Sequence, residues 1–398
     1  MSERFDILFE RFSEESAIEL LKTPPDKLSN PVDKYMAATR LAACNSDRSL
    51  QALIQATDLD PDNLFNRITR RKALEALGRR KNASALPFLF KALDFDDEPS
   101  VINAIDSIAQ ISAPLSDDQC KKLLGALEGS DTQKRCAIQA HTRLQLRSGA
   151  RQISTLVNDT NPLVAGAARA FDARVNGHLD QLEPLVSQLK DPVPGRRRSA
   201  VIDLGDAGDV TKVVHLVSCP VSMPLRAKSA FQLVDPEKTG GVPDAYRQAI
   251  TELLQDDPRN LHLQPEWICE ASTLEIETNL QHRDEGKQYG GAASLLSMTK
   301  TAQLETIDHL HDRLWSDYGA NYLLTSAVGL NIIEERSELV RTALAEALPQ
   351  YAKSRIAAAW ACLRLELSDQ VDLLREIHSS TRWIPLKWSC EQVLKKLS

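Results

Sequence analysis

A short aromatic and acidic segment in the last quarter of the chain has the residue types that could act on a flat, conjugated ligand. It contains Trp315, Asp317, Tyr318 and Tyr322, in a sequence of which only 5% is aromatic. On one continuous helix the three aromatic side chains would share a face. That face could stack on a conjugated ring while the carboxylate and the phenol move protons. The alternative is structural: Asp317 caps a helix that begins at Tyr318, and the aromatic residues belong to the core.

Runs of basic residues are the second feature with chemical meaning. Arg70 and Arg71 lie in one predicted helix, and Arg197 and Arg198 lie in another. Arginine binds carboxylates through two parallel hydrogen bonds, so these side chains could hold an acidic ligand or partner. The alternative is that they are solvated, or pair with aspartates elsewhere in the protein.

Most signatures of metal and cofactor enzymes are missing from the sequence. It has no CxxC, HExxH, GxGxxG or GxSxG motif and no Gly-Lys-Ser/Thr phosphate loop. His309 and His311 are two residues apart, so on a helix they point in nearly opposite directions and cannot share a metal. We expect no metal and no cofactor. The seven scattered cysteines lack a neighbouring base, which argues against a cysteine nucleophile and for reduced thiols in the cytoplasm.

The charge balance limits the classes of partner. The 48 Lys and Arg residues are outnumbered by 55 Asp and Glu residues, giving a net charge of −7. Because nucleic-acid affinity comes from cations that neutralise phosphates, a nucleic-acid partner is disfavoured. Residues 1–6 carry acids where a signal peptide would need a basic and then an apolar region. The longest uncharged stretch, 318–333, is too short to cross a bilayer, so we expect a cytoplasmic protein without a membrane span.

These chemical groups must be positioned by a repeated helical unit. Residues 66–78 and 85–93 read as a helical hairpin in which Ala73 and Leu74 lie where the helices pack, and Gly78 is expected to be the left-handed residue that ends the first helix. Start signals for such units recur about every 30 to 35 residues. They are Asn30-Pro31, Asn66, Pro99, Asp131, Asn161-Pro162, Asp191-Pro192 and 220–224.

The repeat predicts an all-α fold, a curved α-solenoid of HEAT-like helical hairpins. We expect an N-terminal solenoid over 1–235 and a C-terminal solenoid over 292–398. The repeat is lost between them, so 236–291 is predicted to be a junction of loops with helices at 244–255 and 265–281.

The Arg-rich repeat at 66–78, the spacing of the units over 30–234, and the segments 315–329 and 382–390 together resemble the E/F-type phycobilin lyases. Proteins of this family attach bilins to phycobiliproteins in cyanobacteria and red algae. The resemblance covers most of the chain and is weakest at 236–291. A chain of about this length resembles the single-chain members of the family that act on phycoerythrin.

The resemblance implies a lyase that joins phycoerythrobilin, a linear tetrapyrrole with two propionates, through a thioether to a cysteine of an apo-phycoerythrin subunit, expected to be the α subunit. Isomerisation to phycourobilin would add a proton at one carbon and remove one at another. On this reading Asp317 and Tyr318 are the acid and base, and Trp315 and Tyr322 are walls. Arg70, Arg71, Arg197 and Arg198 would then contact the propionates or the acceptor protein. The alternative from another class is a non-catalytic HEAT-repeat scaffold or assembly chaperone.

Overall fold

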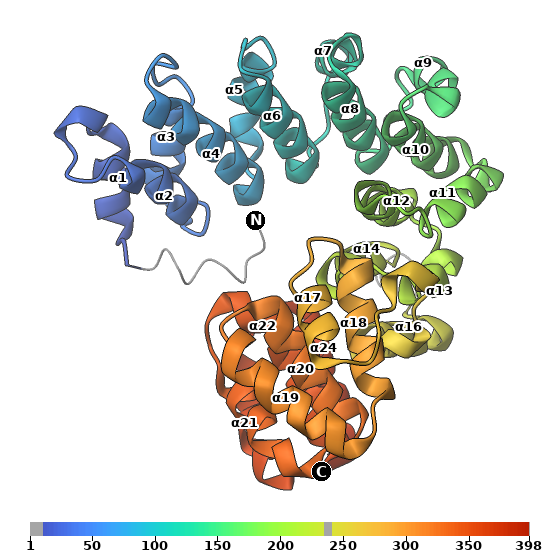
Figure 1. The fold of residues 1–398 in the computed structure, drawn as a ribbon. Coiled ribbons are helices and arrows are strands. Elements are labelled where there is room, and N and C mark those ends of the chain that lie inside the picture. The colour runs from blue at the N-terminus through green and yellow to red at the C-terminus, as the bar shows by residue number, and fades with distance from the viewer. Residues whose placement is uncertain (1–10, 235–240, 398) are drawn as a thin grey trace. The chain divides into compact units, whose positions relative to one another are not determined.

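Helices joined by short turns make up the part of the chain that the computed structural model describes, residues 11–234 and 241–397, and no strand occurs within those ranges (Figure 1). The predicted all-α solenoid of helical hairpins is confirmed. The acidic segment 1–6 and the expected boundary at residue 235 lie outside the described residues. Within the described ranges, no helix is both long and apolar enough to cross a membrane.

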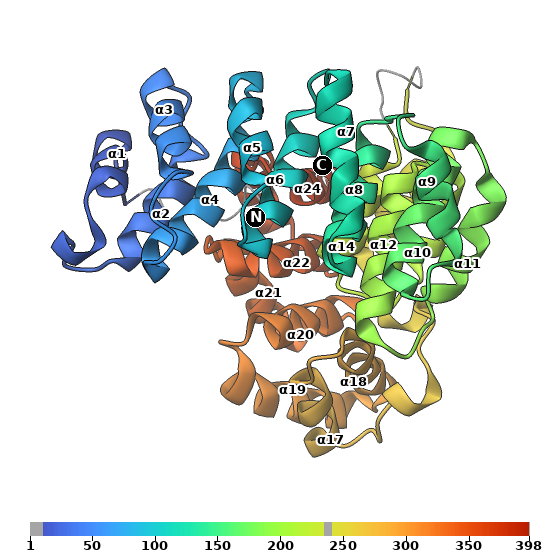
Figure 2. The ribbon, with the colours of Figure 1, turned by 90° about the horizontal axis from the view of Figure 1, so that it is seen from above.

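The chain forms two compact units, Met1–Leu182 and Glu183–Ser398, and each is described by itself. In the first unit, helices α2, α4, α6, α8 and α10 pack side by side in chain order, and α3, α5, α7 and α9 form a second row (Figures 1 and 2). The bounds are α1 Glu14–Lys22, α2 Val32–Leu41, α3 Asp47–Ala56, α4 Leu64–Arg80, α5 Leu86–Ala92, α6 Glu98–Ile111, α7 Asp117–Gly125, α8 Asp131–Arg143, α9 Ala150–Thr155 and α10 Pro162–Phe171.

Capping residues at the repeat starts explain where these helices begin. The Asn161 side chain accepts the amide of Leu163, and Pro162 occupies the first helical position, where a missing N–H costs nothing. One predicted start was displaced: α4 begins at Leu64 because Asn63, three residues before Asn66, is its cap. The start signals in the sequence therefore mark the helices correctly to within a turn.

Gly78 does not end its helix, contrary to the prediction. It lies within α4, and the left-handed residue that follows the helix is Lys81, with φ 51°. A Cβ on Gly78 would lie 2.5 Å from Ser107 Oγ on α6, so glycine is needed for close helix packing. The same close helix contact recurs in the second unit: a Cβ on Gly205 would collide with Ser229, and a Cβ on Gly329 would collide with Ala361.

The second unit contains the remaining helices. Their bounds are α11 Glu183–Gln188, α12 Pro194–Ala207, α13 Val213–Val217, α14 Met223–Gln232, α16 Asp244–Gln255, α17 Thr273–Leu280, α18 Glu285–Ser297, α19 Lys300–Leu314, α20 Tyr318–Leu330, α21 Ser337–Ala345, α22 Ala352–Arg364, α23 Val371–Ser380 and α24 Ile384–Leu397. Helices α18, α20, α22 and α24 pack in succession, and α16 also contacts α22 and α24.

Two glycines on α12 give a matched test of whether glycine is needed at a close helix contact. A Cβ on Gly205 would lie 2.8 Å from Ser229 Cβ and 2.9 Å from its Cα, whereas a Cβ on Gly195 would have nothing within 4 Å. We expect Gly205→Ala to destabilise the second unit by about 1–3 kcal/mol through overpacking. Gly195→Ala should be neutral or stabilising by up to ~1 kcal/mol, because alanine favours the helix. Denaturant melts followed by tryptophan fluorescence measure both, and equal effects would contradict the packing role of Gly205.

The described part of the predicted junction, residues 241–291, contains buried contacts as well as turns. The predicted helix 244–255 is confirmed as α16. The predicted helix 265–281 is wrong: a 3-10 turn at Pro265–Trp267 precedes α17, which begins only at Thr273. Trp267 is 3% exposed and contacts Gly286 and Gly290 of α18, where a Cβ would not fit. The segment therefore joins short helices through turns, some buried, as at Trp267, and some exposed, as at Ile268 and Leu274. The three-part division of the chain stays a prediction.

Candidate functional site

A pocket of about 390 Å³ lies at the end of α19 in the second unit. Its lining comes from the last turn of α19, the turn into α20, α20 itself, the end of α21, and the 3-10 turn Pro349–Tyr351. The lining residues are His311, Asp312, Arg313, Trp315, Ser316, Asn321, Thr342, Ala343, Glu346 and Tyr351. This size is within the usual range for small-ligand sites, about 300–1,000 Å³.

The four aromatic and acidic residues singled out in the sequence have separate positions. The helix is not continuous: α19 ends at Leu314 and α20 begins at Tyr318, so the three rings do not share a face. Trp315 lines the pocket and packs on the His311 ring, with centroids 4.8 Å apart. Tyr318 is 56% exposed and meets Tyr351 edge to face, with centroids 6.5 Å apart.

Asp317 is the N-cap of α20, as the structural alternative predicted. Its Oδ1 accepts the backbone amides of Gly319 and Ala320, both at 2.8 Å. These bonds satisfy two of the amides that a helix start leaves free. The side chain is nevertheless exposed, so capping does not remove it from reach of a ligand.

Tyr322 belongs to a buried polar network. Asp256 forms an ion pair with Arg226 and accepts the phenol hydroxyls of Tyr289, at 2.7 Å, and of Tyr322. Arg226 also donates to the carbonyl oxygens of Val221 at 2.6 Å and Val217 at 2.7 Å. Burial, together with the Asp256 carboxylate, raises the pKa of both tyrosines well above the usual range. Both therefore remain neutral hydrogen-bond donors, and Tyr322 does not line the pocket.

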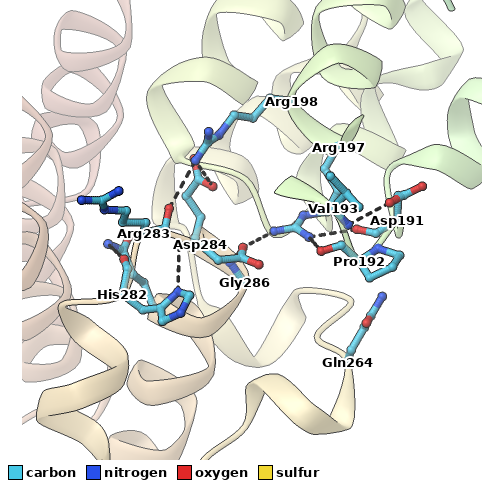
Figure 3. Close-up of polar contacts among 12 residues, drawn as sticks. Asp191, Pro192, Val193, Arg197, Arg198, Gln264, His282, Arg283, Asp284 and Gly286 are labelled. Carbon is cyan, nitrogen blue, oxygen red and sulfur yellow. Dashed lines mark hydrogen bonds and ion pairs between the residues drawn. The ribbon is translucent and has the colours of Figure 1, made fainter. Parts of the chain in front are cut away.

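Arg197 and Arg198 bind two consecutive acidic residues at the start of α18 (Figure 3). Arg197 is fully buried. It forms an ion pair with Asp284, donates to the Asp191 carbonyl at 2.9 Å, and lies over the Trp267 ring at 4.4 Å.

Arg198 holds Glu285 through two bonds of 2.8 and 2.7 Å, and its side chain is 42% exposed. Arg197 therefore has no accessible side-chain surface for a ligand, whereas part of the Arg198 side chain is accessible.

Arg70 and Arg71 in the first unit also have partners within the chain. Arg70 is 6% exposed, donates to the Thr57 carbonyl at 3.1 Å and lies over the Phe95 ring. Arg71 pairs with Asp97, the N-cap of α6, whose pKa it helps to lower to about 2. The pairing of basic clusters with aspartates, given above as the alternative, is thus what the structure contains for Arg71.

Three buried cysteines of the second unit are poor nucleophiles. Burial raises the pKa of Cys219, Cys362 and Cys390 to about 12, so these side chains are protonated thiols at neutral pH. Within the described residues, no group of three or more His, Cys, Asp or Glu side chains is placed to hold a metal ion.

Sequence reasoning missed the residues that complete the pocket and the buried network. Asn321 and Tyr351 lie in the pocket, yet neither belongs to a recognisable motif. Asp256 precedes Asp257-Pro258 in the segment that was predicted to be a junction of loops, yet it is 3% exposed. The available signal was the amphipathic helix 244–255 directly before it, whose last turn buries Leu253 and Leu254.

Known proteins resemble this chain over most or all of its length. It is 26% identical, over 100% of this chain and 94% of the relative, to the "Uncharacterized phycocyanin operon protein Y" of Pseudanabaena tenuis (strain PCC 7409). It is 24% identical, over 89% of this chain and 86% of the relative, to the "Bilin biosynthesis protein CpeY" of Synechococcus sp. (strain WH8020). No family model matches the chain.

A solved structure shares the fold. The complex of CpcE and CpcF of phycocyanin lyase from Nostoc sp. PCC7120 matches with a TM-score of 0.53 at 19% identity, covering 62% of this chain and 95% of that one. The helical hairpins and their spacing define the class, an α-solenoid with a ligand-sized pocket in its second unit. Together with the full-length relatives they support an assignment of the chain to the E/F-type phycobilin lyases.

Proposed function

We propose that this chain attaches phycoerythrobilin to a cysteine of a phycoerythrin subunit, the α subunit, and isomerises it to phycourobilin. The observation that carries the proposal is the pocket at the end of α19, with Trp315 and Tyr351 as aromatic walls, in a chain of this family. The bilin biosynthesis protein among its relatives supports the choice of pigment class.

The attachment step needs orientation more than a protein nucleophile. The acceptor thiol adds across the exocyclic C=C bond of the bilin: sulfur bonds to the outer carbon, and the thiol proton ends on the neighbouring ring carbon. Holding the bilin in one conformation fixes the face and the ring that react, and orientation of this kind lowers barriers by several kcal/mol, up to ~10. The isomerisation removes a proton from one carbon and adds one at another, with no net redox change.

The exposed groups beside the pocket are suited to these proton transfers. Asp317 and Tyr318 lie at the start of α20, two and three residues after the pocket residue Trp315, and both are exposed. We propose them as the acid and base. Arg71 and Arg198, whose side chains are 29% and 42% exposed, remain candidates for contacts with the acceptor protein or a propionate.

Asp317→Asn tests the site without removing the helix cap, because an amide oxygen can accept the same two amides that Asp317 accepts. The chain is produced with a phycoerythrobilin source and the apo-α subunit, and the product is read by mass and absorption. We expect the wild type to give a covalently coloured subunit, absorbing at shorter wavelength if isomerised. D317N should reduce attachment about 10²-fold or more, the scale of a lost acid–base group.

The control is Asp209→Asn, which alters a cap residue of the turn Val210–Lys212 outside the pocket and should leave attachment unchanged. Unmodified subunits with wild-type protein, tested against β as well as α acceptors, would refute the lyase proposal. If D317N gives as much coloured subunit as the wild type, the proposed role of Asp317 is refuted, but the lyase proposal is not. Binding of the acceptor subunit without any optical change on adding bilin would favour a scaffold.

A further inference from the structure

Three segments of the second unit are held together beside α13. The carbonyl oxygen of Ser218, directly after α13, accepts the backbone amide of His262 at 2.8 Å. Two residues further on, the side-chain amide of Gln264 donates to the carbonyl oxygen of Lys190 at 2.7 Å. These two bonds fix the residues after α11, the end of α13 and the segment 262–264 relative to one another.

Basic side chains gather where these segments meet. They are Lys190, Lys212, His215 and His262, and each is at least partly exposed. Lys212 is paired with Glu183, at the start of α11, at 2.6 Å. Among the described residues, no acid binds Lys190 or either of the two imidazoles. Because the whole chain has a net charge of −7, this group is a local excess of positive charge in an acidic protein.

The two histidines lie within range of the neighbouring charges. Burial and the positive charges of Lys212, His262 and Lys190 lower the pKa of His215, and the Glu183 carboxylate opposes this change. Burial and the charge of Lys190 lower the pKa of His262. An anion placed beside the two imidazoles would raise both pKa values, because it favours their charged forms. Binding of an anion here is therefore linked to the uptake of protons.

An exposed apolar side chain adjoins the basic group. Val214 is 56% exposed, and with His215 it forms the side of α13 opposite the buried Val213 and Leu216. A small anion would leave Val214 uncovered. An acidic protein segment could cover it and place carboxylates over the surrounding bases, which is the charge complementarity found at protein–protein interfaces.

We propose that the surface formed by Lys190, Val214, His215 and His262 binds an acidic segment of the acceptor subunit, with carboxylates facing the three bases and an apolar side chain covering Val214. This inference rests on the proposed function for the identity of the partner. It assigns recognition of the acceptor protein to elements other than those that line the pocket at the end of α19.

The test is a calorimetric titration of the purified full-length chain with the purified apo-α subunit, without bilin. Lys190→Glu reverses the charge of an exposed side chain, and we expect affinity to fall about tenfold or more, because like charges then face each other across the interface. The matched control is Lys396→Glu, which makes the same change of net charge at an exposed residue in the last turn of α24. Its affinity should stay within about twofold of wild type.

The pH dependence of binding gives a second readout, which a structural role of these residues would not produce. Because the imidazoles take up protons when the acidic segment binds, wild-type affinity should rise several-fold as the pH falls from about 8 to about 6. The double variant His215→Gln and His262→Gln keeps side chains that form hydrogen bonds but do not titrate. It should lose most of this rise.

The outcomes separate this inference from the proposed function. Weaker binding by K190E than by K396E, with a pH response that requires the two histidines, supports the docking surface even if the subunit is never coloured. Equal affinities of K190E and K396E overturn it, even if coproduction shows the chain to be a lyase. A full pH response in the histidine double variant, or no binding of the subunit by the wild type, also overturns it. Because Lys190 is exposed, the K190E measurement does not depend on a change in folding.

Discussion

Arg197→Ala is expected to destabilise the second unit by about 3–5 kcal/mol, enough to remove much of the stability of an ordinary domain. The substitution leaves Asp284 at the start of α18 without the guanidinium that neutralises it. It also removes the bond to the Asp191 carbonyl and uncovers the face of Trp267. Most of the cost comes from the buried carboxylate that remains, since its desolvation is no longer offset.

The neighbouring Arg198→Ala is the matched control, because it breaks an ion pair to the adjacent acid, Glu285, at a partly exposed site. We expect a loss below ~1 kcal/mol. All five tryptophans lie between residues 267 and 388, so tryptophan fluorescence in a denaturant melt reports the second unit alone. If both variants lose the same small amount of unfolding free energy, the buried pair of Arg197 and Asp284 does not determine the stability of this unit.

Arg226→Ala is expected to have an effect of the same size, about 3–5 kcal/mol, for a related reason. Arg226 is fully buried and neutralises Asp256, which is 3% exposed. Without it, the two tyrosine hydroxyls donate to a carboxylate that has lost its counter-charge. The backbone carbonyls of Val217 and Val221 lose their donor as well.

Adding Asp256→Asn to Arg226→Ala should restore part of that loss. The amide carries no charge, can still accept from Tyr289 or Tyr322, and asparagine tolerates the left-handed backbone of residue 256, φ 47°. The double variant should therefore be more stable than R226A alone, a sign of coupling between contacting residues. Denaturation of the four proteins of this cycle measures it, and simple additivity would show that Asp256 is not left as an uncompensated charge.

Helix positions were predictable because caps and small residues act locally. Asn161-Pro162 starts α10 whatever surrounds it, and the buried alanines follow the helical period. The role of Gly78 was not predictable in the same way. A glycine near the end of a helix suits both a left-handed cap and a close helix contact, and only the partner Ser107, 29 positions later, decides between them.

The candidate site was predictable only in part, because its residues depend on long-range contacts. Trp315 was found from its type and lies in the pocket, and Asp317 was correctly offered as a cap. Tyr322 was grouped with Trp315 on the assumption of one continuous helix, but the turn at 315–317 separates them. Nothing near Arg197 in the sequence reveals that Asp284 binds it, so its basic neighbours made it resemble a surface cluster.

The pairing of Arg197 with Asp284 also bears on how the chain is made. Solenoid repeats usually contact only their neighbours and can fold one after another. Here 87 residues separate the partners, so at roughly 5–20 residues per second the ribosome needs about 4 to 17 s to supply the acid after the arginine. Until then Arg197 on α12 lacks its acidic partner, although α11 and α14, on which α12 packs, are already made. The second unit is therefore expected to fold late, and in truncations ending before residue 284 this unit should be unfolded.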